Sequence, residues 1–220
     1  MRTHLYQVAT QLFRERGFEA TTLREIASRA KVSPGLLYRY FPSKRAVVLA
    51  LHDELSGAFE REVTAMPSGR WRQRFLFALR TSLRVLGPHR ETLANLIPLL
   101  VSRQEESVLS PATVFSRERV EGAFVAAVKG ASDAPGERDA CSLGRILYLA
   151  HLGLLLWWLL DRSREQRATK LLLGFSEKAL VPVALALRLP ATRRLLAELD
   201  RAAEAALWAD ETTSVPEGAR

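Results

Sequence analysis

The sequence has few of the residues that build metal or thiol sites. Its single cysteine, Cys141, excludes an internal disulfide and a cysteine-based zinc site. The four histidines fall in different predicted helices and form no i,i+4 pair, which is the spacing that a helical zinc site uses. We therefore expect no metal site and no cofactor.

Sequence signatures of catalysis are also missing. The 220 residues contain no glycine-rich phosphate loop, nucleophile elbow or paired-carboxylate arrangement. A lone serine, histidine and aspartate can be found in any chain of this length, so their presence indicates nothing by itself. We expect a protein that is not an enzyme.

No apolar run is long enough to predict a membrane span. The longest, ILYLAHLGLLLWWLL, covers residues 146–160 and is bounded by Arg145 and Asp161. As a helix it would extend ~22 Å, whereas a bilayer core needs ~30 Å and about twenty residues. The N-terminal residues mix charged and apolar side chains and do not form the continuous apolar core of a signal peptide. We expect no membrane association and a cytoplasmic location.

Positive charge is concentrated at the start of the chain. Residues 1–50 hold nine lysines and arginines against three glutamates, whereas the remaining residues hold 23 basic and 21 acidic side chains. A basic segment joined to a nearly neutral, apolar body indicates a head that binds a polyanion.

Apolar residues recur with the 3.6-residue period of helices almost throughout, and no segment shows the alternation of a half-buried strand. This pattern predicts an all-α fold. Three helices are expected before residue 41, and longer ones at about 43–65, 70–86, 89–105, 111–129, 139–162, 165–188 and 190–209. Residues 211–220 carry no apolar face, and we expect a disordered tail there.

The ends of the first helices are marked by local signals. Gly17 stops the first helix, and Thr22 and Glu25 have the spacing of a capping box for the second. Ser33 and Pro34 suit the cap and first position of the third helix. Two short helices joined by about four residues in a basic segment are typical of a DNA-binding helix-turn-helix, although many all-α proteins contain such a hairpin.

The residues around this hairpin resemble a known family. The segment ATTLREIASRAKVSPGLLYRYFPSKRAVV, preceded by ATQLFRERGFE, is similar to the DNA-binding domain of the tetracycline-repressor (TetR) family over about residues 2–50. The resemblance implies a three-helix helix-turn-helix domain at 1–48 and a helical ligand-binding and dimerisation domain at 49–210. It also implies a homodimer that binds a palindromic operator in double-stranded DNA and represses transcription until a small molecule releases it. Activation instead of repression stays open.

The resemblance also implies which residues contact DNA. They are Thr22, Arg24, Ser33, Pro34, Gly35, Leu36, Tyr38, Arg39, Tyr40 and Lys44. Arg39 could read a guanine through its O6 and N7 atoms or bind a phosphate, and Tyr40 could bind a phosphate or only pack the head. The sequence departs from the family pattern in two places. Lys31 stands where a glycine is usual and a positive φ is tolerated, so it either carries about 1 kcal/mol of strain or adopts a different turn. The short basic arm that many relatives carry before the first helix is missing.

The apolar body offers a candidate effector pocket. The resemblance places a pocket for a small apolar or aromatic molecule at Phe75, Leu79, Leu96, Leu100, Phe115, Phe124, His151 and Trp157. Ordinary core packing is the alternative for each of these side chains, and the ligand's identity cannot be read from the sequence.

The run at 146–160 is apolar all round, so a helix there must be covered on several faces. We expect the helices at 139–162 and 165–188 to form a symmetric four-helix dimer interface. The residues expected at this interface are Leu149, Leu152, Leu156, Leu159, Leu172, Phe175, Ala179, Leu180, Val183 and Leu187. The alternative is a dimeric helical interaction protein without specific DNA binding or ligand response.

Overall fold

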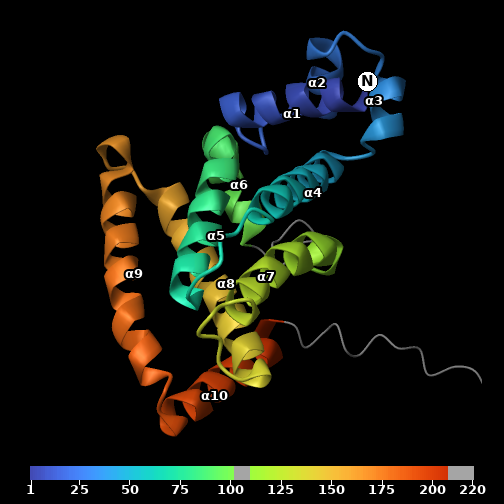
Figure 1. Ribbon diagram of the computed structural model, residues 1–220. Helices are drawn as coiled ribbons and strands as arrows, with labels where there is room; N and C mark the ends of the chain where they lie inside the picture. Colours follow the sequence, from blue (N-terminus) through green and yellow to red (C-terminus); the bar gives the residue numbers. More distant parts are fainter. Residues whose placement is uncertain (102–109, 208–220) are drawn as a thin grey trace, which may run out of the picture. The chain divides into compact units, whose positions relative to one another are not determined.

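The computed structural model describes residues 1–101 and 110–207, and this part of the chain is helical with no strand, as the sequence predicts (Figure 1). Three 3-10 turns, η1 (Gly87–His89), η2 (Pro111–Thr113) and η3 (Arg164–Gln166), join some of the helices. The α-helices are α1 (Arg2–Arg16), α2 (Leu23–Arg29), α3 (Pro34–Tyr40), α4 (Lys44–Val63), α5 (Trp71–Leu86), α6 (Arg90–Leu100), α7 (Val114–Lys129), α8 (Glu137–Leu160), α9 (Arg167–Ala186) and α10 (Pro190–Leu207).

The helices group into two compact units. Among the described residues, one contains 1–61, 82–101 and 110–119, and the other contains 62–81 and 120–207. The division cuts through α4, α5 and α7, so compactness alone does not mark a boundary at residue 48. The domain limits at 48 and 210 therefore stay predictions, and the expected tail at 211–220 lies outside the described residues.

The first unit is organised around α1. Leu5, Ala9 and Phe13 are fully buried along one face of this helix, with the 3.6-residue spacing that the sequence shows. Gly17 ends α1 in the left-handed region at φ 82°. The Asn95 amide of α6 donates hydrogen bonds to the carbonyls of Phe13 (3.3 Å) and Arg14 (3.0 Å). Because the last carbonyls of a helix have no partner within it, α6 completes the end of α1.

In the second unit, α5 and α7 also complete each other's ends. The Asp133 carboxylate, just beyond α7, accepts a hydrogen bond from the Trp71 amide at the start of α5 (2.8 Å). In the other direction, the Arg74 guanidinium of α5 donates to the carbonyls of Ala127 (2.8 Å) and Ala126 (3.2 Å) near the end of α7.

Helix α10 is fixed to α8 by a buried carboxylate. Asp200 is 3% exposed and accepts hydrogen bonds from the Ser142 hydroxyl (2.6 Å) and from both Nε and a terminal nitrogen of Arg145. Burial alone would raise the pKa of Asp200, but the hydrogen bonds from Arg145 and Ser142 outweigh it and leave that pKa below its ordinary value. A buried charge of this kind is tolerated because it is paired and hydrogen-bonded.

Helix α8 is longer than the apolar run that it contains. It has 24 residues, and within the described part of the chain it is the helix whose length and composition would suffice to cross a membrane. The core helix of a soluble protein passes the same test. Most buried residues of α8 fall on one face, where Leu147, His151, Leu154 and Trp158 follow the i+4, i+3, i+4 spacing, whereas Ser142 is buried on the opposite side against Asp200.

Where α7 and α8 cross, glycine permits a close approach. A Cβ atom added at Gly144 would lie 2.5 Å from the Cα atom of Val125, so the backbones would have to separate.

We expect Gly144→Ala to lower the free energy of unfolding by about 1–3 kcal/mol, measured by urea denaturation. Gly122→Ala in α7 is the matched control, because a Cβ there meets nothing within 4 Å. It should raise stability by about 0.5–1 kcal/mol through helix propensity. Equal effects of the two substitutions would contradict the close crossing.

Candidate nucleic-acid interface

Helix α2 begins with the capping box that the sequence predicts. The Thr22 hydroxyl accepts a hydrogen bond from the Glu25 amide (3.2 Å), and the Glu25 carboxylate accepts one from the Thr22 amide (2.8 Å). The backbone hydrogen bond from Thr22 holds the pKa of Glu25 below its ordinary value. The start of α2 is thereby defined without help from the body.

In the turn between α2 and α3, position 31 takes the left-handed conformation, the strained one of the two alternatives left open by the sequence. Lys31 has φ 56°, and its amide donates to the Ser28 carbonyl (3.1 Å). The next amide, of Val32, donates to the Ala27 carbonyl (3.0 Å). A side chain with a Cβ atom is strained in this region, whereas glycine adopts it freely.

Helix α3 is held to the head by one buried residue and presents the rest of its surface. Leu37 is fully buried, and the Ser33 hydroxyl caps the helix by accepting from the Leu36 amide (3.2 Å). Leu36 is half-buried, whereas Tyr38 and Tyr40 are 49% and 38% exposed. The remaining predicted contacts on or next to α3 are also exposed: Ser33, Pro34, Gly35 and Arg39. An α-helix fits the width of the DNA major groove, and this one has enough exposed surface to present several side chains there.

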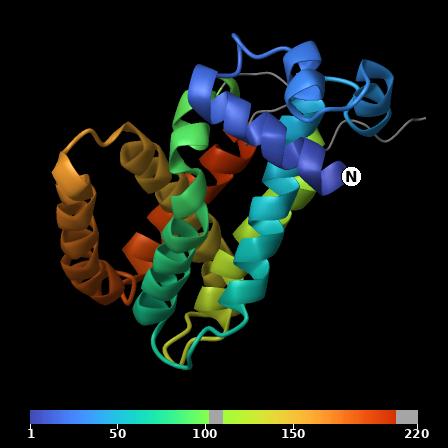
Figure 2. The same cartoon turned by 90° about the horizontal axis from the view of Figure 1, so that it is seen from above.

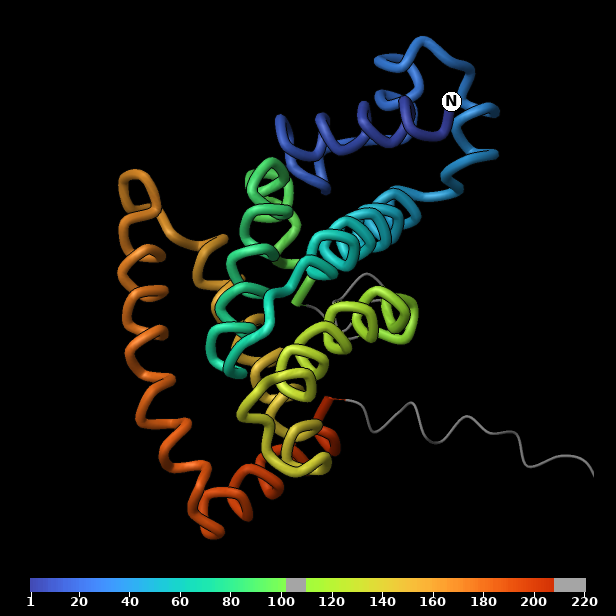
Figure 3. The backbone as a smooth tube through the Cα atoms, in the orientation of Figure 1, coloured from blue at the N-terminus to red at the C-terminus, as the bar shows by residue number. Residues whose placement is uncertain are grey.

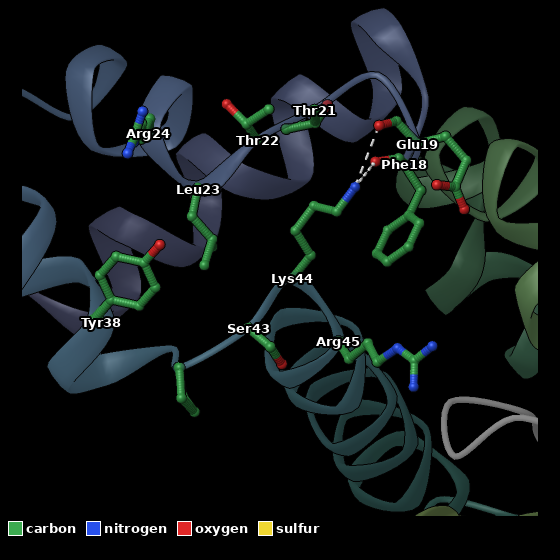
Figure 4. A pocket seen from close by; sticks show the side chains of 11 residues that line it. Phe18, Glu19, Thr21, Thr22, Leu23, Arg24, Tyr38, Ser43, Lys44 and Arg45 are labelled. Carbon is green, nitrogen blue, oxygen red and sulfur yellow. Dashed lines mark hydrogen bonds between the residues drawn. The ribbon is translucent and has the colours of Figure 1, made fainter.

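The starts of α2 and α4 and one tyrosine of α3 enclose an open hollow of about 790 Å³ (Figure 4). Four of the predicted DNA contacts line it together: Thr22, Arg24, Tyr38 and Lys44. Arg45, which the sequence reasoning did not include, adds another cation; it follows Lys44 in the same basic pair. The other lining residues are Phe18, Glu19, Thr21, Leu23, Pro42 and Ser43.

Lys44 has a structural partner that the sequence did not reveal. Its ammonium donates to the carbonyls of Phe18 (2.7 Å) and Glu19 (3.3 Å) in the turn after α1, and it lies 4.4 Å from the centre of the Phe18 ring (Figure 4). A cation in the first turn of a helix opposes the helix dipole, and the two carbonyls offset that cost. An ammonium has three donors, so one is left for a phosphate oxygen.

Four of the residues predicted for an effector pocket are buried in the second unit. Phe75, Leu79, Phe124 and His151 are at most 4% exposed, and the Phe124 and His151 rings lie 4.6 Å apart. Burial lowers the pKa of His151 to about 3, so the imidazole is neutral at physiological pH. Tyr148 joins this cluster at 6.2 Å from His151. The sequence reasoning missed it, although its spacing of three residues from His151 is a helical signal.

Two predicted pocket residues lie on the wrong side of their helices. Phe115 is 77% exposed and Trp157 is 50% exposed. On α7 the buried residue nearby is Arg117, about 200° away from Phe115 around the helix. On α8 the buried residue is Trp158, directly after Trp157. Leu96 and Leu100 are buried in α6, which belongs to the other compact unit, so a pocket shared with them stays a prediction.

The residues predicted for a dimer interface all retain exposed surface. Leu156, Phe175 and Val183 are 38%, 66% and 44% exposed. The other seven are half-buried: Leu149, Leu152, Leu159, Leu172, Ala179, Leu180 and Leu187. The second unit buries only Thr169 of α9, and Figures 2 and 3 show this helix (orange) along the outer edge of the unit.

Comparison with known proteins relates the chain to bacterial regulators. The sequence model of a family described as bacterial regulatory proteins, tetR family, matches residues 5–51. An HTH-type transcriptional repressor of Mycobacterium tuberculosis is 46% identical over 57 residues, which cover 26% of this chain and 30% of that protein. The HTH-type transcriptional repressor KstR2 of Rhodococcus jostii is 34% identical over 139 residues, or 60% of this chain and 67% of that protein.

Solved structures of similar fold extend the likeness beyond the head. A TetR transcriptional regulator from Nitrosomonas europaea gives a TM-score of 0.59 at 20% identity and covers 81% of this chain and 97% of its own. PfmR, a TetR-family transcriptional regulator from Thermus thermophilus, gives 0.59 at 19% identity and covers 80% and 94%. At this identity the likeness concerns the fold alone.

The strained turn before α3 gives a stability prediction. Lys31→Gly should raise the free energy of unfolding by about 0.5–1 kcal/mol, because glycine adopts a left-handed φ without a Cβ clash. Lys31→Ala removes the same charge but keeps the Cβ atom, so it should give no gain. Thermal unfolding of the two variants beside the native protein measures the difference. A gain in Lys31→Ala equal to that in Lys31→Gly would assign the effect to charge instead of backbone strain.

Proposed function

The chain belongs to the TetR family of bacterial regulatory proteins, and we propose that it is a transcriptional repressor, not an enzyme, that binds a palindromic operator as a homodimer. The observation that carries this proposal is the exposed face of α3 beside the cation-lined hollow. The chain aligns with 30% of the length of the mycobacterial repressor and with 67% of the length of KstR2. The activity of the whole protein is therefore inferred from the residues of this chain.

DNA binding is supported by the way that the head divides its residues. Leu37 anchors α3, which leaves Arg39 and Tyr38 free to enter a major groove. Arg24 and Lys44 come from the neighbouring helices and both line the hollow, and we assign them to phosphates of the DNA backbone. Phosphate contacts set the register of a protein on DNA, and base contacts give the sequence preference. In this assignment Arg39 reads a guanine, and the hollow binds the backbone.

A homodimer is supported by the apolar surface of α8 and α9. The apolar run in α8 was predicted to need cover on several faces and α9 to share its interface, and Leu156, Phe175 and Val183 are exposed in the single chain. Large apolar side chains gathered on one side of a molecule mark an interaction surface. A two-fold dimer presents two copies of α3, which matches the symmetry of a palindromic operator.

The buried cluster around His151 supports an effector that is small and apolar or aromatic. Its Phe75, Phe124 and Tyr148 rings offer stacking partners, and the neutral imidazole offers one polar contact. Such a ligand can release the operator only if it binds the non-binding arrangement of the protein more tightly than the binding one. Soluble DNA-binding regulators of this kind act in the cytoplasm, which is where we place this protein.

Selection of bound sequences from randomised DNA by the purified protein tests DNA recognition. We expect one palindrome, with affinity that falls steeply as salt rises because bound phosphates release counterions. Arg39→Ala should weaken binding roughly 5- to 150-fold for each half-site and relax the preference at one base of each half-site, because the dimer loses one arginine–guanine contact in each. If Arg39 binds a phosphate instead, the loss will be uniform across sequences and the salt slope will fall by about two, one for each half-site of the dimer.

The control for this experiment is Arg138→Ala, which removes an exposed arginine at the start of α8. It should leave affinity and preference unchanged. A protein that dimerises but selects no sequence would refute the proposal and favour a helical interaction protein. Repeating the assay with small apolar and aromatic compounds tests the effector.

Sedimentation equilibrium tests the homodimer. The native chain should sediment as a dimer at micromolar concentration, and Phe175→Glu should shift it toward monomer because a charge would be buried against an apolar partner. Arg138→Glu introduces the same carboxylate on an exposed site outside the proposed interface and should leave the dimer intact. A native protein that sediments as a monomer would overturn this part of the proposal.

A further inference from the structure

Helix α4 is attached at its first residue to the DNA-binding head. Its Lys44 ammonium donates to the Phe18 and Glu19 carbonyls in the turn between α1 and α2. The Ser43 hydroxyl caps the same end by accepting a hydrogen bond from the Ala46 amide (3.1 Å). Any shift of α4 is therefore passed to this turn through directional bonds.

Further along α4, a second cation holds the helix to α7. The Arg119 guanidinium donates to the Asp53 carbonyl (3.3 Å), the Asp53 carboxylate (3.1 Å) and the Ser56 hydroxyl (2.8 Å). Its Nε atom lies 3.2 Å from the Glu60 carboxylate. These contacts span two turns of α4, so one side chain of α7 fixes both the position and the rotation of the helix.

The Arg119 contact lies partly within the protein. The Arg119 side chain is 25% exposed, and Ser56 is 6% exposed and itself donates to the Asp53 carbonyl (3.1 Å). A Cβ atom at Gly57 would lie 3.6 Å from the guanidinium, which shows that the guanidinium lies directly against the backbone of α4. The Asp53 and Glu60 side chains are 72% and 58% exposed, so solvent screens these two ion pairs, and the directional contact depends mainly on the Asp53 carbonyl and the Ser56 hydroxyl.

The apolar contacts of α4 cannot supply the same precision. Leu51, Leu55 and Phe59 bury its other face, and burial of apolar surface has no directional preference. A guanidinium has donors in a rigid fork, so its hydrogen bonds are satisfied only in a narrow range of helix positions. The register of α4 on α7 therefore depends on Arg119 more than on the apolar packing.

We propose that Arg119 is a positioning residue that sets the half-site spacing accepted by the dimer, acting through α4 and Lys44 on the head. The proposal rests on the proposed function. Lys44 and Glu60 are sixteen residues apart, or ~24 Å along the helix, so a tilt of 10° at one end moves the other by roughly 4 Å. One base pair of DNA adds 3.4 Å and about 34–36° of twist between half-sites. A tilt of α4 therefore moves a head by as much as the rise of one base pair, and looser positioning of α4 should widen the range of spacings and twists that the two heads accept.

The test compares Arg119→Met with Arg74→Met. Arg74 is a matched control because its guanidinium also makes three hydrogen bonds, to the carbonyls of Pro67, Ala126 and Ala127, and none of them involves α4. For each variant, Kd is measured for the operator selected by the native protein and for the same operator with one base pair inserted or removed at its centre.

We expect the native protein and Arg74→Met to discriminate between these operators by the same factor, even where Arg74→Met is less stable. Arg119→Met should reduce that factor at least threefold, and Arg119→Lys should recover part of it because an ammonium can still pair with one carboxylate. All measurements are made at a temperature where circular dichroism shows each variant folded. An unchanged factor in Arg119→Met would overturn the proposal.

A second measurement separates failure of this proposal from failure of the proposed function. Spin labels are placed at Gln7→Cys in α1 and Ala112→Cys in η2, both exposed positions of the first unit, in a Cys141→Ser background diluted with unlabelled protein. The distribution of label distances should be broader in Arg119→Met than in Arg74→Met. Equal widths would overturn the positioning role, whereas a native protein that selects no DNA would overturn the proposed function alone.

Discussion

Helix α3 has to be held firmly while nearly all of its surface stays exposed, and this constraint shapes the rest of the head. One side chain, Leu37, is its buried anchor. Full burial of a leucine contributes about 1.5–3 kcal/mol, which is little for a helix of two turns. The remaining order comes from its ends, where Ser33 caps the start and the Phe41 amide donates to the Leu37 carbonyl (2.8 Å).

Helix ends are also where distant parts of the chain are joined. Asn95 completes the end of α1, Arg74 the end of α7 and Asp133 the start of α5. These contacts exist because the first amides and last carbonyls of every helix need partners from outside it. The same principle places Lys44 on the carbonyls after α1. Side chains that satisfy helix ends thus fix how each compact unit is assembled.

Interactions within a few residues were predictable from the sequence. The capping box of Thr22 and Glu25 and the Ser33 cap follow from residue type and spacing, because every atom involved lies within one turn, whereas the left-handed Lys31 was one of two alternatives that the family resemblance left open. The buried face of α8 was harder to predict. A helix that is apolar on every side has no polar face to mark which side meets solvent. Trp157 was therefore as good a candidate for the interior as Trp158.

The sequence by itself determined that the chain is helical, where its first helices begin and end, and that a basic helix-turn-helix opens it, since local hydrogen bonds and periodicity decide these features. Tertiary structure decided which face of α8 is buried and what the cations of the head and α7 bind. Lys44 meets a carbonyl 26 residues away and Arg119 a carboxylate 66 residues away. Such pairs form only when separate helices pack together, so no local sequence pattern predicts them.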